Sequence, residues 1–378
     1  QPGGEDQVFD DECWLLESRG HEVVRFTMHN DGLDDMSRLQ MLQKTIWNSM
    51  VEQDLVKLIR QERPDVMHCH NTFPLISPAA YHAARSENVA VVQTLHNYRF
   101  ICPGALLQRS GHPCEDCLGR NALPAIRHRC YRDSVAATAA IVWMLEFNRW
   151  RNSYHTLVDC YIALTPFAAG RLSAGGLPAD RITIKPNFLP NAPKPGTGGG
   201  NYAVFTGRLS REKGVETLVH AWKNVTGLSL KIVGDGPLRG QLVEAARHAP
   251  ENIEFLGYCS QDRVLEIVRQ AELQIIPSEC YEGLPMVILE AFALGTPVVA
   301  ARIGSLDALV EHGKTGVKFD VGDANDLATK VNTLWQDKNS LSSMRRAARR
   351  TFEKKYTEGA NYRSLIEIYN NAVKEYKS

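Results

Sequence analysis

The sequence has no excess charge of either sign, no long apolar run and no visible export signal. Lys plus Arg and Asp plus Glu each number 43, so the net charge is zero and gives no whole-molecule argument for a nucleic-acid partner. A membrane-spanning helix needs roughly 18 uninterrupted apolar residues, and the nearest run, residues 135–145, is too short. Nine cysteines, an odd number without a secretory signature, favour a reducing compartment. We therefore expect a cytoplasmic protein without a nucleic-acid partner.

The 378 residues suffice for two domains, and 44% of them are hydrophobic. Short β-branched segments alternate with helical patterns, such as the helix predicted over residues 41–62. In the first half, strands are predicted at residues 21–27, 65–71, 89–97, 159–166 and 182–187. In the second half, the strand-like segments are YAVFTG, LSLKIVG, IEFLG, LQIIPS and TPVVAA. This alternation predicts an α/β fold with parallel sheets covered by helices on both faces.

A composition change divides the chain. Residues 186–201, PNFLPNAPKPGTGGGN, contain four prolines and four glycines and are the best linker candidate. We predict a Rossmann-like domain over 1–187, a linker over 188–200 and a second Rossmann-like domain over 201–358. The opening QPGGEDQVF is typical of a strand-to-helix loop, so a first strand is expected to be missing. The last helix, about residues 360–378, is a candidate to pack back on the first domain.

Two cations follow a predicted strand in GRLSREKG. Ligands of open α/β sheets bind at the carboxyl ends of the strands, and a cleft between two such domains is the expected binding site. Arg208 and Lys213 surround a turn there, before a helix that starts near Gly214, and could hold a diphosphate. The alternative is a pair of solvated surface charges. VGDGP, residues 233–237, is a glycine-rich turn after the next strand, but alone it is a weak signal.

The stretch ECYEGLPMVILEAFALGTPVVAA contains two carboxylates, Glu282 and Glu290, eight residues apart. Gly283 lets the backbone approach a ligand closely, and Pro285 suits the first turn of a helix. The N–H groups around residues 284–286 then form an anion site at a helix N-terminus. A glycosidase needs its two carboxyls on either side of the scissile bond. Here a phosphate site lies beside them, which favours a sugar-transfer site over hydrolysis.

These motifs resemble those of the retaining glycosyltransferases of family 4, which have the GT-B fold. The matching segments, in order, are GRLSREKG, VGDGP, FLGYCS, PSECYEGLPMVILEAFALGTPVVA and HGKTGVKF. They cover most of residues 200–320 and are highly specific as a set. The resemblance implies two Rossmann-like, doubly wound parallel-sheet domains facing a central cleft.

The resemblance also implies roles for single residues. Arg208 and Lys213 would hold the donor diphosphate. Glu290 would bind the ribose hydroxyls, and Glu282 would contact the donor sugar, with His96 of TLHN beside it. The catalytic set is thus Glu282, His96, Arg208 and Lys213. Backbone groups near the sugar, phosphate and base complete the donor site: Gly3, Gly4, Gly207, Gly234, Gly257, Tyr258, Gly283, Leu284, Pro285 and Met286.

The implied reaction is front-face transfer with retention at the anomeric carbon, from a nucleotide-diphosphate-sugar to a saccharide or lipid-linked acceptor in cell-surface polysaccharide synthesis. UDP and GDP sugars are the expected donors, although ADP sugars fit the motifs too. The family needs no metal for catalysis, and the sequence has no Asp-x-Asp motif. In ARIGSLDALVEHG a glutamate common in the family is replaced by Ala308 or shifted to Asp307, which puts sugar or base contacts of this loop in doubt. The alternatives are a GT-B sugar phosphorylase or hydrolase and a non-catalytic nucleotide-sugar binder.

Four cysteines, Cys102, Cys114, Cys117 and Cys130, follow the spacing C-x11-C-x2-C-x12-C. Four thiolates at such spacing suit a closed tetrahedral zinc site, which would be structural because cysteine fills every position. The segment between them is loop-like and would gain most from a metal staple. Reduced core thiols, or a disulfide formed on isolation, are the alternative.

Two further segments each allow two interpretations. CYRDSVAATAAIVWMLEFNRWR has an apolar run bordered by arginines. It fits an interfacial helix that meets a lipid-linked acceptor at an anionic membrane, or else a buried core helix. In HCHN, His68 and His70 share a face at the end of a predicted strand. They fit a metal site, or else packed or cleft-lining histidines, which is the safer interpretation.

Overall fold

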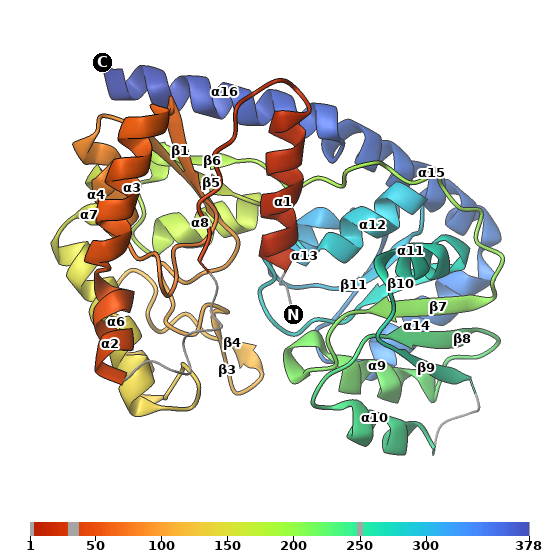
Figure 1. The fold of residues 1–378 in the computed structure, drawn as a ribbon. Coiled ribbons are helices and arrows are strands. Elements are labelled where there is room, and N and C mark those ends of the chain that lie inside the picture. Colours follow the sequence, from red (N-terminus) through yellow and green to blue (C-terminus); the bar gives the residue numbers. More distant parts are fainter. Residues whose placement is uncertain (1–3, 29–37, 248–251, 378) are drawn as a thin grey trace. The chain divides into compact units, whose positions relative to one another are not determined.

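The computed structural model describes residues 4–28, 38–247 and 252–377. The chain divides into two compact units (Figure 1). The first unit comprises residues 1–107, 114–186 and 362–378, and the second comprises residues 108–113 and 187–361. Each unit has its own parallel sheet and its own buried hydrophobic residues.

A parallel sheet in the order β1-β2-β5-β6 forms the centre of the first unit. Its strands are β1 (Val66–Cys69), β2 (Ala90–Leu95), β5 (Cys160–Ala163) and β6 (Ile182–Ile184). Every residue of β2 is buried, as expected of a central strand covered on both faces. Cys69 pairs with Gln93 in the ladder, so the carboxyl ends of β1 and β2 lie at one edge of the sheet. His70 follows β1 directly and His96 follows β2, which brings the two histidines to that edge.

The helices of the first unit surround this sheet. They are α1 (Gly4–Glu17), α2 (Arg38–Ile46), α3 (Ser49–Glu62), α4 (Ala79–Ser86), α5 (Pro124–Arg127), α6 (Val135–Trp150), α7 (Ser153–Thr156), α8 (Pro166–Ala174) and the 3₁₀ turn η2 (Ala179–Arg181). The single helix predicted over residues 41–62 is wrong, because the chain breaks at Trp47 and Asn48. Asn48 caps α3, since its side chain accepts a hydrogen bond from Val51 N.

The strand predicted at residues 21–27 is also wrong. The segment has no regular secondary structure, and Val24 is 50% exposed. A β-branched segment becomes a strand only when a neighbouring strand supplies its hydrogen bonds. Within the part of the chain that the structure describes, no strand pairs with this segment. The other four strands predicted in this half are confirmed as β1, β2, β5 and β6.

A larger parallel sheet, in the order β12-β11-β10-β7-β8-β9, forms the second unit. Its strands are β7 (Tyr202–Thr206), β8 (Ser229–Val233), β9 (Ile253–Gly257), β10 (Leu273–Ile276), β11 (Val298–Ala301) and β12 (Gly316–Phe319). All five strands predicted in this half are present. The short antiparallel pair β3 (Gln108–Arg109) and β4 (His112–Pro113) also belongs to this unit.

The helices of the second unit connect these strands and extend into a helical tail. They are η3 (Arg211–Lys213), α9 (Val215–Trp222), α10 (Arg239–Ala246), α11 (Gln261–Gln270), α12 (Met286–Leu294), α13 (Gly304–Leu309), α14 (Ala324–Gln336) and α15 (Lys338–Lys355). The last helix, α16 (Glu358–Lys377), begins in the second unit, but its residues from 362 onward belong to the first. There Leu365, Ile368 and Ala372 pack against β2 and β5 through Val92 and Ile162. Among the described residues, no helix combines the length and the apolar character needed to cross a membrane.

Candidate functional site

Glycines connect the ends of three neighbouring strands in the second unit. Gly207 N donates to Val233 O at 3.0 Å, and Gly234 N donates to Gly257 O at 2.8 Å. A Cβ on Gly234 would lie 1.9 Å from Gly207 O, so no other residue fits this close approach. The loops that the motifs identify after β7, β8 and β9 therefore lie together at the carboxyl edge of the sheet, where α/β sheets bind ligands.

A lysine and a carboxylate from two of the motifs meet in the same unit. Lys213 Nζ donates to Glu282 Oε1 at 2.6 Å, and Ser278 Oγ donates to the same oxygen at 2.8 Å. Burial acts to lower the pKa of Lys213, but the Glu282 carboxylate outweighs burial and leaves the pKa above its ordinary value. Lys213 is therefore charged. Gly214 lets the two loops pack, since a Cβ there would lie 1.9 Å from Pro277 O.

The helix that follows Glu282 begins one residue later than the sequence suggests. Pro285 is the N-cap of α12 and not a first-turn residue, and Met286 is the first helical residue. Ile288 N is the first amide of this turn to bond backward, to Pro285 O at 3.0 Å. The amides of Met286 and Val287 have no acceptor in the helix, as at any helix start. They remain available to a ligand anion.

Glu290 lies one and a half turns further along α12 and is 7% exposed. Burial raises the pKa of Glu290, opposed by the hydrogen bond that Gln261 Nε2 donates to its Oε1 at 2.7 Å. Glu282 is bonded to a lysine and Glu290 to an amide. The two carboxylates thus have different partners, and they do not form an acid/base pair across one bond.

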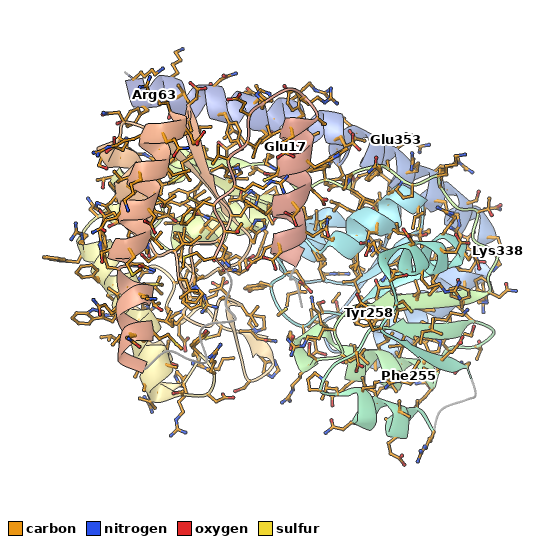
Figure 2. The ribbon with its side chains drawn as sticks, viewed as in Figure 1. Glu17, Arg63, Phe255, Tyr258, Lys338 and Glu353 are labelled. Carbon is orange, nitrogen blue, oxygen red and sulfur yellow. The ribbon has the colours of Figure 1, made fainter. Side chains whose placement is uncertain are left out.

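Of the other residues singled out in this unit, Leu284 is buried, whereas the following ones lie at the surface. Arg208 is exposed just beyond β7. Tyr258, directly after β9, is 76% exposed (Figure 2). Asp307, in the loop that departs from the family pattern, accepts a hydrogen bond from Lys318 Nζ at 2.7 Å, and Ala308 beside it is exposed. In the structure Asp307 is thus paired with a lysine.

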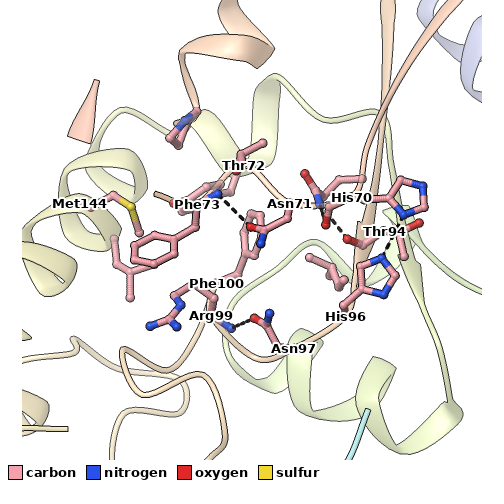
Figure 3. Close-up of a pocket in the computed structure, with 15 residues that line it drawn as sticks. His70, Asn71, Thr72, Phe73, Thr94, His96, Asn97, Arg99, Phe100 and Met144 are labelled. Atoms are coloured by element: carbon pink, nitrogen blue, oxygen red, sulfur yellow. Dashed lines mark hydrogen bonds between the residues drawn. The ribbon is translucent and has the colours of Figure 1, made fainter. Parts of the chain in front are cut away.

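In the first unit, His96 lines a pocket at the sheet edge (Figure 3). Burial, reinforced by the neighbouring His70, lowers the pKa of His96 to about 3. The ring is therefore neutral. Gly4 is the first residue of α1, and the next residue, Glu5, accepts a hydrogen bond from Asn71 Nδ2 at 2.6 Å. Gly3 lies outside the described residues.

Several residues of this pocket have no counterpart in the sequence prediction. Arg99 lies over the Phe73 ring at 4.5 Å and over the Tyr131 ring at 5.1 Å. His70 Nδ1 lies 3.1 Å from His96 Nε2, and the two rings are stacked. Of the two interpretations of HCHN, the cleft-lining one describes His70, because it lines the pocket. Arg99 could have been recognised from the sequence, because it lies three residues after His96 in TLHNYR.

The four clustered cysteines lie in one region of the first unit. Cys102 and Cys117 are buried, and none of the nine cysteines is assigned to a disulfide. Burial, followed by the charges of Cys102, Cys130 and Cys114, raises the pKa of Cys117 to about 11. The other three thiols therefore lie close enough to Cys117 to affect its pKa, although no three of the four sulfur atoms lie within 4.8 Å of one another. The donor set suits zinc, but the sulfurs must draw closer to bind it.

The long apolar helix α6 has two different faces. Ile141, Val142, Met144 and Leu145 are buried in a cluster of the first unit. On other positions of the helix, Val135 is 49%, Trp143 62% and Trp150 80% exposed. Both sequence interpretations thus describe part of the helix: one face is core, and the other presents large apolar side chains at the surface.

Family profiles match nearly the whole chain. The profile described as Glycosyltransferase Family 4 matches residues 2–190, half of the chain, and the one described as Glycosyl transferases group 1 matches residues 191–351. Among curated proteins, the glycogen synthase of Mycobacterium tuberculosis is 29% identical over 301 residues, 77% of this chain and 64% of that protein. The sulfoquinovosyl transferase SQD2 of Arabidopsis thaliana is 31% identical over 173 residues, 45% of this chain and 33% of that protein. The chain thus spans about one third to two thirds of these relatives.

Solved structures share the fold over nearly the full length. The structure of HepE of Anabaena in complex with UDP has a TM-score of 0.68 at 18% identity, covering 97% of this chain and 96% of that one. The sucrose-phosphate synthase of Thermosynechococcus elongatus has a TM-score of 0.70 at 17% identity, covering 97% and 93%. At such identity the likeness establishes the fold, which is the GT-B type predicted from the sequence.

Proposed function

Because this chain belongs to glycosyltransferase family 4 and has the GT-B fold, we propose that it moves a sugar from a nucleotide-diphosphate-sugar to a saccharide or lipid-linked acceptor, with retention. The observation that carries the proposal is the Lys213–Glu282 contact at 2.6 Å beside the start of α12. The contact supports a site in which a cation, a carboxylate and the free amides of a helix start act together. These groups suit a phosphorylated sugar, because the cation and the amides can bind phosphate and the carboxylate can accept hydrogen bonds from sugar hydroxyls.

Each residue of the site has a role in this proposal. Lys213 and Arg208 neutralise the diphosphate, together with the amides at the start of α12. The donor phosphate competes with Glu282 for Lys213, which leaves the Glu282 carboxylate to accept hydrogen bonds from the sugar. Glu290 accepts from the ribose hydroxyls, and the exposed loop at Gly257 and Tyr258 meets the base.

The chemistry follows from charge stabilisation. The bond between the anomeric carbon and the diphosphate oxygen breaks, and the acceptor oxygen bonds to the same face of that carbon. The acceptor's proton goes to the departing diphosphate. Lys213 and Arg208 stabilise the negative charge that develops on the leaving group, so the step is proposed to need no metal. Neither glutamate has to transfer a proton.

A UDP-sugar is the first donor to test, with a GDP-sugar second. The UDP complex of Anabaena HepE supports this order through the shared fold. Synthesis of a cell-surface polysaccharide remains the proposed setting. A cytoplasmic location, with contact to the inner face of a membrane through the exposed side of α6, fits a lipid-linked acceptor.

A structural zinc held by Cys102, Cys114, Cys117 and Cys130 is a separate part of the proposal.

The assay that tests the function measures nucleotide-diphosphate release and glycoside formation from a panel of donors. Lys213→Ala and Glu282→Ala are each expected to lower the transfer rate by about 10² to 10³, the usual effect of losing one charge-stabilising contact. Lys223→Ala, an exposed lysine at the end of α9, is the matched control and should retain full activity. Full activity in Lys213→Ala would refute the phosphate site.

Free sugar released without any nucleotide would indicate a phosphorylase or hydrolase. Binding of a nucleotide sugar without turnover would indicate a non-catalytic binder.

A further inference from the structure

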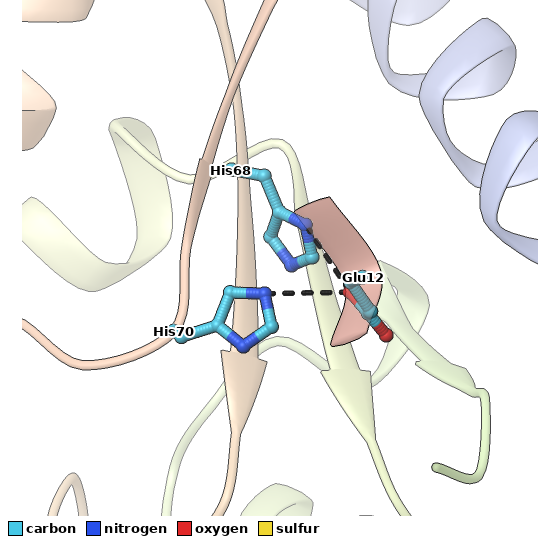
Figure 4. Close-up of side chains that lie close together, drawn as sticks. All are labelled: Glu12, His68 and His70. Atoms are coloured by element: carbon cyan, nitrogen blue, oxygen red, sulfur yellow. Dashed lines mark ion pairs between the residues drawn. The ribbon is translucent and has the colours of Figure 1, made fainter. Parts of the chain in front are cut away.

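A buried carboxylate from α1 supports the histidine pair at the pocket. Glu12 is 2% exposed, and its Oε2 lies 3.3 Å from His70 Nε2 (Figure 4). His70 Nδ1 in turn lies 3.1 Å from His96 Nε2 (Figure 3). The second contact is a hydrogen bond. The first is an ion-pair distance only, because Glu12 Oε2 is buried without an aligned hydrogen-bond partner among the described residues. Together the two contacts relate Glu12 through His70 to His96 in a chain. In the sequence, His96 was assigned to the site and His70 was singled out as a metal-site, packed or cleft-lining histidine, whereas Glu12 was not singled out.

Lys185 fixes the charge state of this chain. Its Nζ donates to Glu12 Oε1, and its side chain is 1% exposed. Burial acts to raise the pKa of Glu12, but the nearby Lys185 and the histidines outweigh burial and hold that pKa well below its ordinary value. Glu12 is therefore a carboxylate and can only accept hydrogen bonds.

The proton positions follow from the donor and acceptor rules. Facing a carboxylate, His70 Nε2 carries a hydrogen. In a neutral His70 whose single hydrogen is on Nε2, the other ring nitrogen, Nδ1, is an acceptor. The facing His96 Nε2 must then carry a hydrogen. A neutral His96 has only one N–H, so its Nδ1 is bare.

A metal ion suits this cluster less well, although Glu12, His68 and His70 offer ligand atoms within 4.8 Å of one another. The Lys185 ammonium already occupies one carboxylate oxygen. Both nitrogens of His68 have hydroxyl partners at 2.8 Å, Tyr369 on Nδ1 and Thr94 on Nε2. A bound cation would have to break these contacts and lie beside a buried positive charge.

We propose that Glu12 is a positioning residue that acts through His70 to hold His96 in the tautomer with Nε2 protonated and Nδ1 bare. His96 then offers the bound sugar an acceptor for one of its hydroxyl groups. This use of the ring rests on the proposed function, whereas the tautomer itself does not. Glu12 and His70 touch neither the sugar nor the diphosphate in this proposal.

Glu12→Gln gives a sharp test, because Lys185 fixes the amide's orientation. The amide oxygen must accept from Lys185, so the amide nitrogen faces His70 Nε2 and donates to it. His70 then carries its hydrogen on Nδ1 and donates to His96 Nε2. The expected result is an inverted His96 tautomer, with Nδ1 protonated, measured by ¹⁵N NMR of the imidazole nitrogens in the full-length protein without substrate.

A second variant and a control separate this effect from damage to the fold. Glu12→Gln combined with Lys185→Gln removes both charges together and should also invert the tautomer, since the amide introduced at position 185 still donates to the amide oxygen at position 12. His68→Gln is the control. It alters the same cluster without touching His96, and it should leave the wild-type tautomer. A His96 with Nδ1 protonated in the wild type, or an unchanged tautomer in both Glu12 variants, would overturn the proposal.

Activity and metal measurements complete the test. Glu12→Gln should lower kcat about tenfold, the effect of one lost hydrogen bond, with little change in KM for the nucleotide sugar, because the nucleotide contacts lie in the second unit. If the tautomers behave as expected but the wild type transfers no sugar, the proposed function fails and the positioning chain stands. Stoichiometric zinc binding that shifts the His68 and His70 signals would overturn the positioning role.

Discussion

At the scale of single residues, Lys213 and Glu282 of two motifs pair with each other, whereas other site side chains depend on partners outside the motifs. Glu290 is held by Gln261, which lies 29 positions away, and Glu12 contacts Lys185 across 173 positions. The loops that carry the motifs could be located from the sequence because each is one contiguous segment; their donor-binding role stays a prediction. The support of His96 could not, because nothing local in the sequence relates Glu12 to Lys185.

Glu290→Gln should raise stability and weaken nucleotide binding. Burial raises the pKa of Glu290 above its ordinary value of 4.5. The unfolded chain therefore releases this proton more readily, and stability falls as pH rises from about 4.5 through the raised pKa. At pH 7.5 the amide should raise the free energy of unfolding, measured by denaturant titration. Because a neutral amide binds ribose hydroxyls more weakly than a carboxylate, the nucleotide Kd should rise about tenfold.

The pH dependence provides a check on the cause. The stability gain should disappear as pH falls below 4.5, where the wild-type carboxyl is neutral in both states. Glu216→Gln on the exposed side of α9 is the matched control and should change neither quantity. A Glu290→Gln protein that is less stable at pH 7.5 would show that burial of the carboxylate is not the dominant effect.

At the scale of elements, the sequence pattern correctly predicted the strands that pair with another strand. It failed where contacts with distant parts of the chain determine the local structure. β7, β8, β10 and β11 carry β-branched or other apolar residues that are buried in a parallel ladder, so composition and position agree. β9, at the edge of the sheet, is only partly buried. Residues 21–27 have the same composition but no pairing partner in the described chain. The break between α2 and α3 depends on Asn48, whose Nδ2 also donates to Leu75 O at 2.6 Å. Asn48 is an ordinary capping residue, and its signal was available but was read as helix interior.

The cysteine segment should be ordered by one zinc ion. Elemental analysis of the purified protein is expected to give about one zinc per chain, and chelation should lower the melting temperature. Cys114→Ser should lose the metal, because three thiolates and a hydroxyl hold zinc more weakly than four thiolates. Cys259→Ser, a cysteine of the second unit, is the control and should keep it. Absence of zinc from protein purified without chelator would favour the alternative of reduced core thiols.

The exposed side of α6 should bind anionic membranes. Trp143 and Trp150 are largely exposed, and Arg127, Arg129, Arg132 and Arg151 near the helix ends are exposed as well. This combination of apolar and basic side chains is typical of interfacial helices. We expect sedimentation with phosphatidylglycerol vesicles but not with phosphatidylcholine vesicles. Burying a large apolar side chain contributes about 1.5–3 kcal/mol, so Trp143→Ser with Trp150→Ser should lower binding more than tenfold.

A matched change elsewhere checks the assignment to α6. Trp14→Ser on α1 also removes a partly exposed tryptophan and should leave vesicle binding intact. Equal binding by the α6 variant and the wild type would refute this surface. Equal binding to neutral and anionic vesicles would remove the role of the arginines.

At the scale of the whole molecule, the chain combines a recognisable unit with a less recognisable one. The motifs that carried the resemblance lie within residues 200–320, whose loops are proposed to bind the nucleotide sugar. No comparable motif was recognised for the acceptor in the sequence of the first unit. This explains why the donor class could be proposed from sequence and the acceptor could not.

Nucleotide diphosphates should raise the melting temperature of the protein, and that of the second unit more than that of the first. A ligand that binds only the folded state adds about 2.7 kcal/mol at a hundredfold excess over its Kd. Apart from Gly3 and Gly4, the proposed nucleotide contacts lie in the second unit, so calorimetry with UDP should raise the transition temperature of that unit more than that of the first unit. GDP and ADP are compared at the same concentration, and the nucleotide with the largest shift identifies the donor. Lys213→Ala should abolish the shift in melting temperature, whereas Lys223→Ala should retain it. Of these two lysines, Lys213 is the one proposed to contact the diphosphate. If none of the three nucleotides shifts any transition of the wild type, the donor site proposed here is wrong.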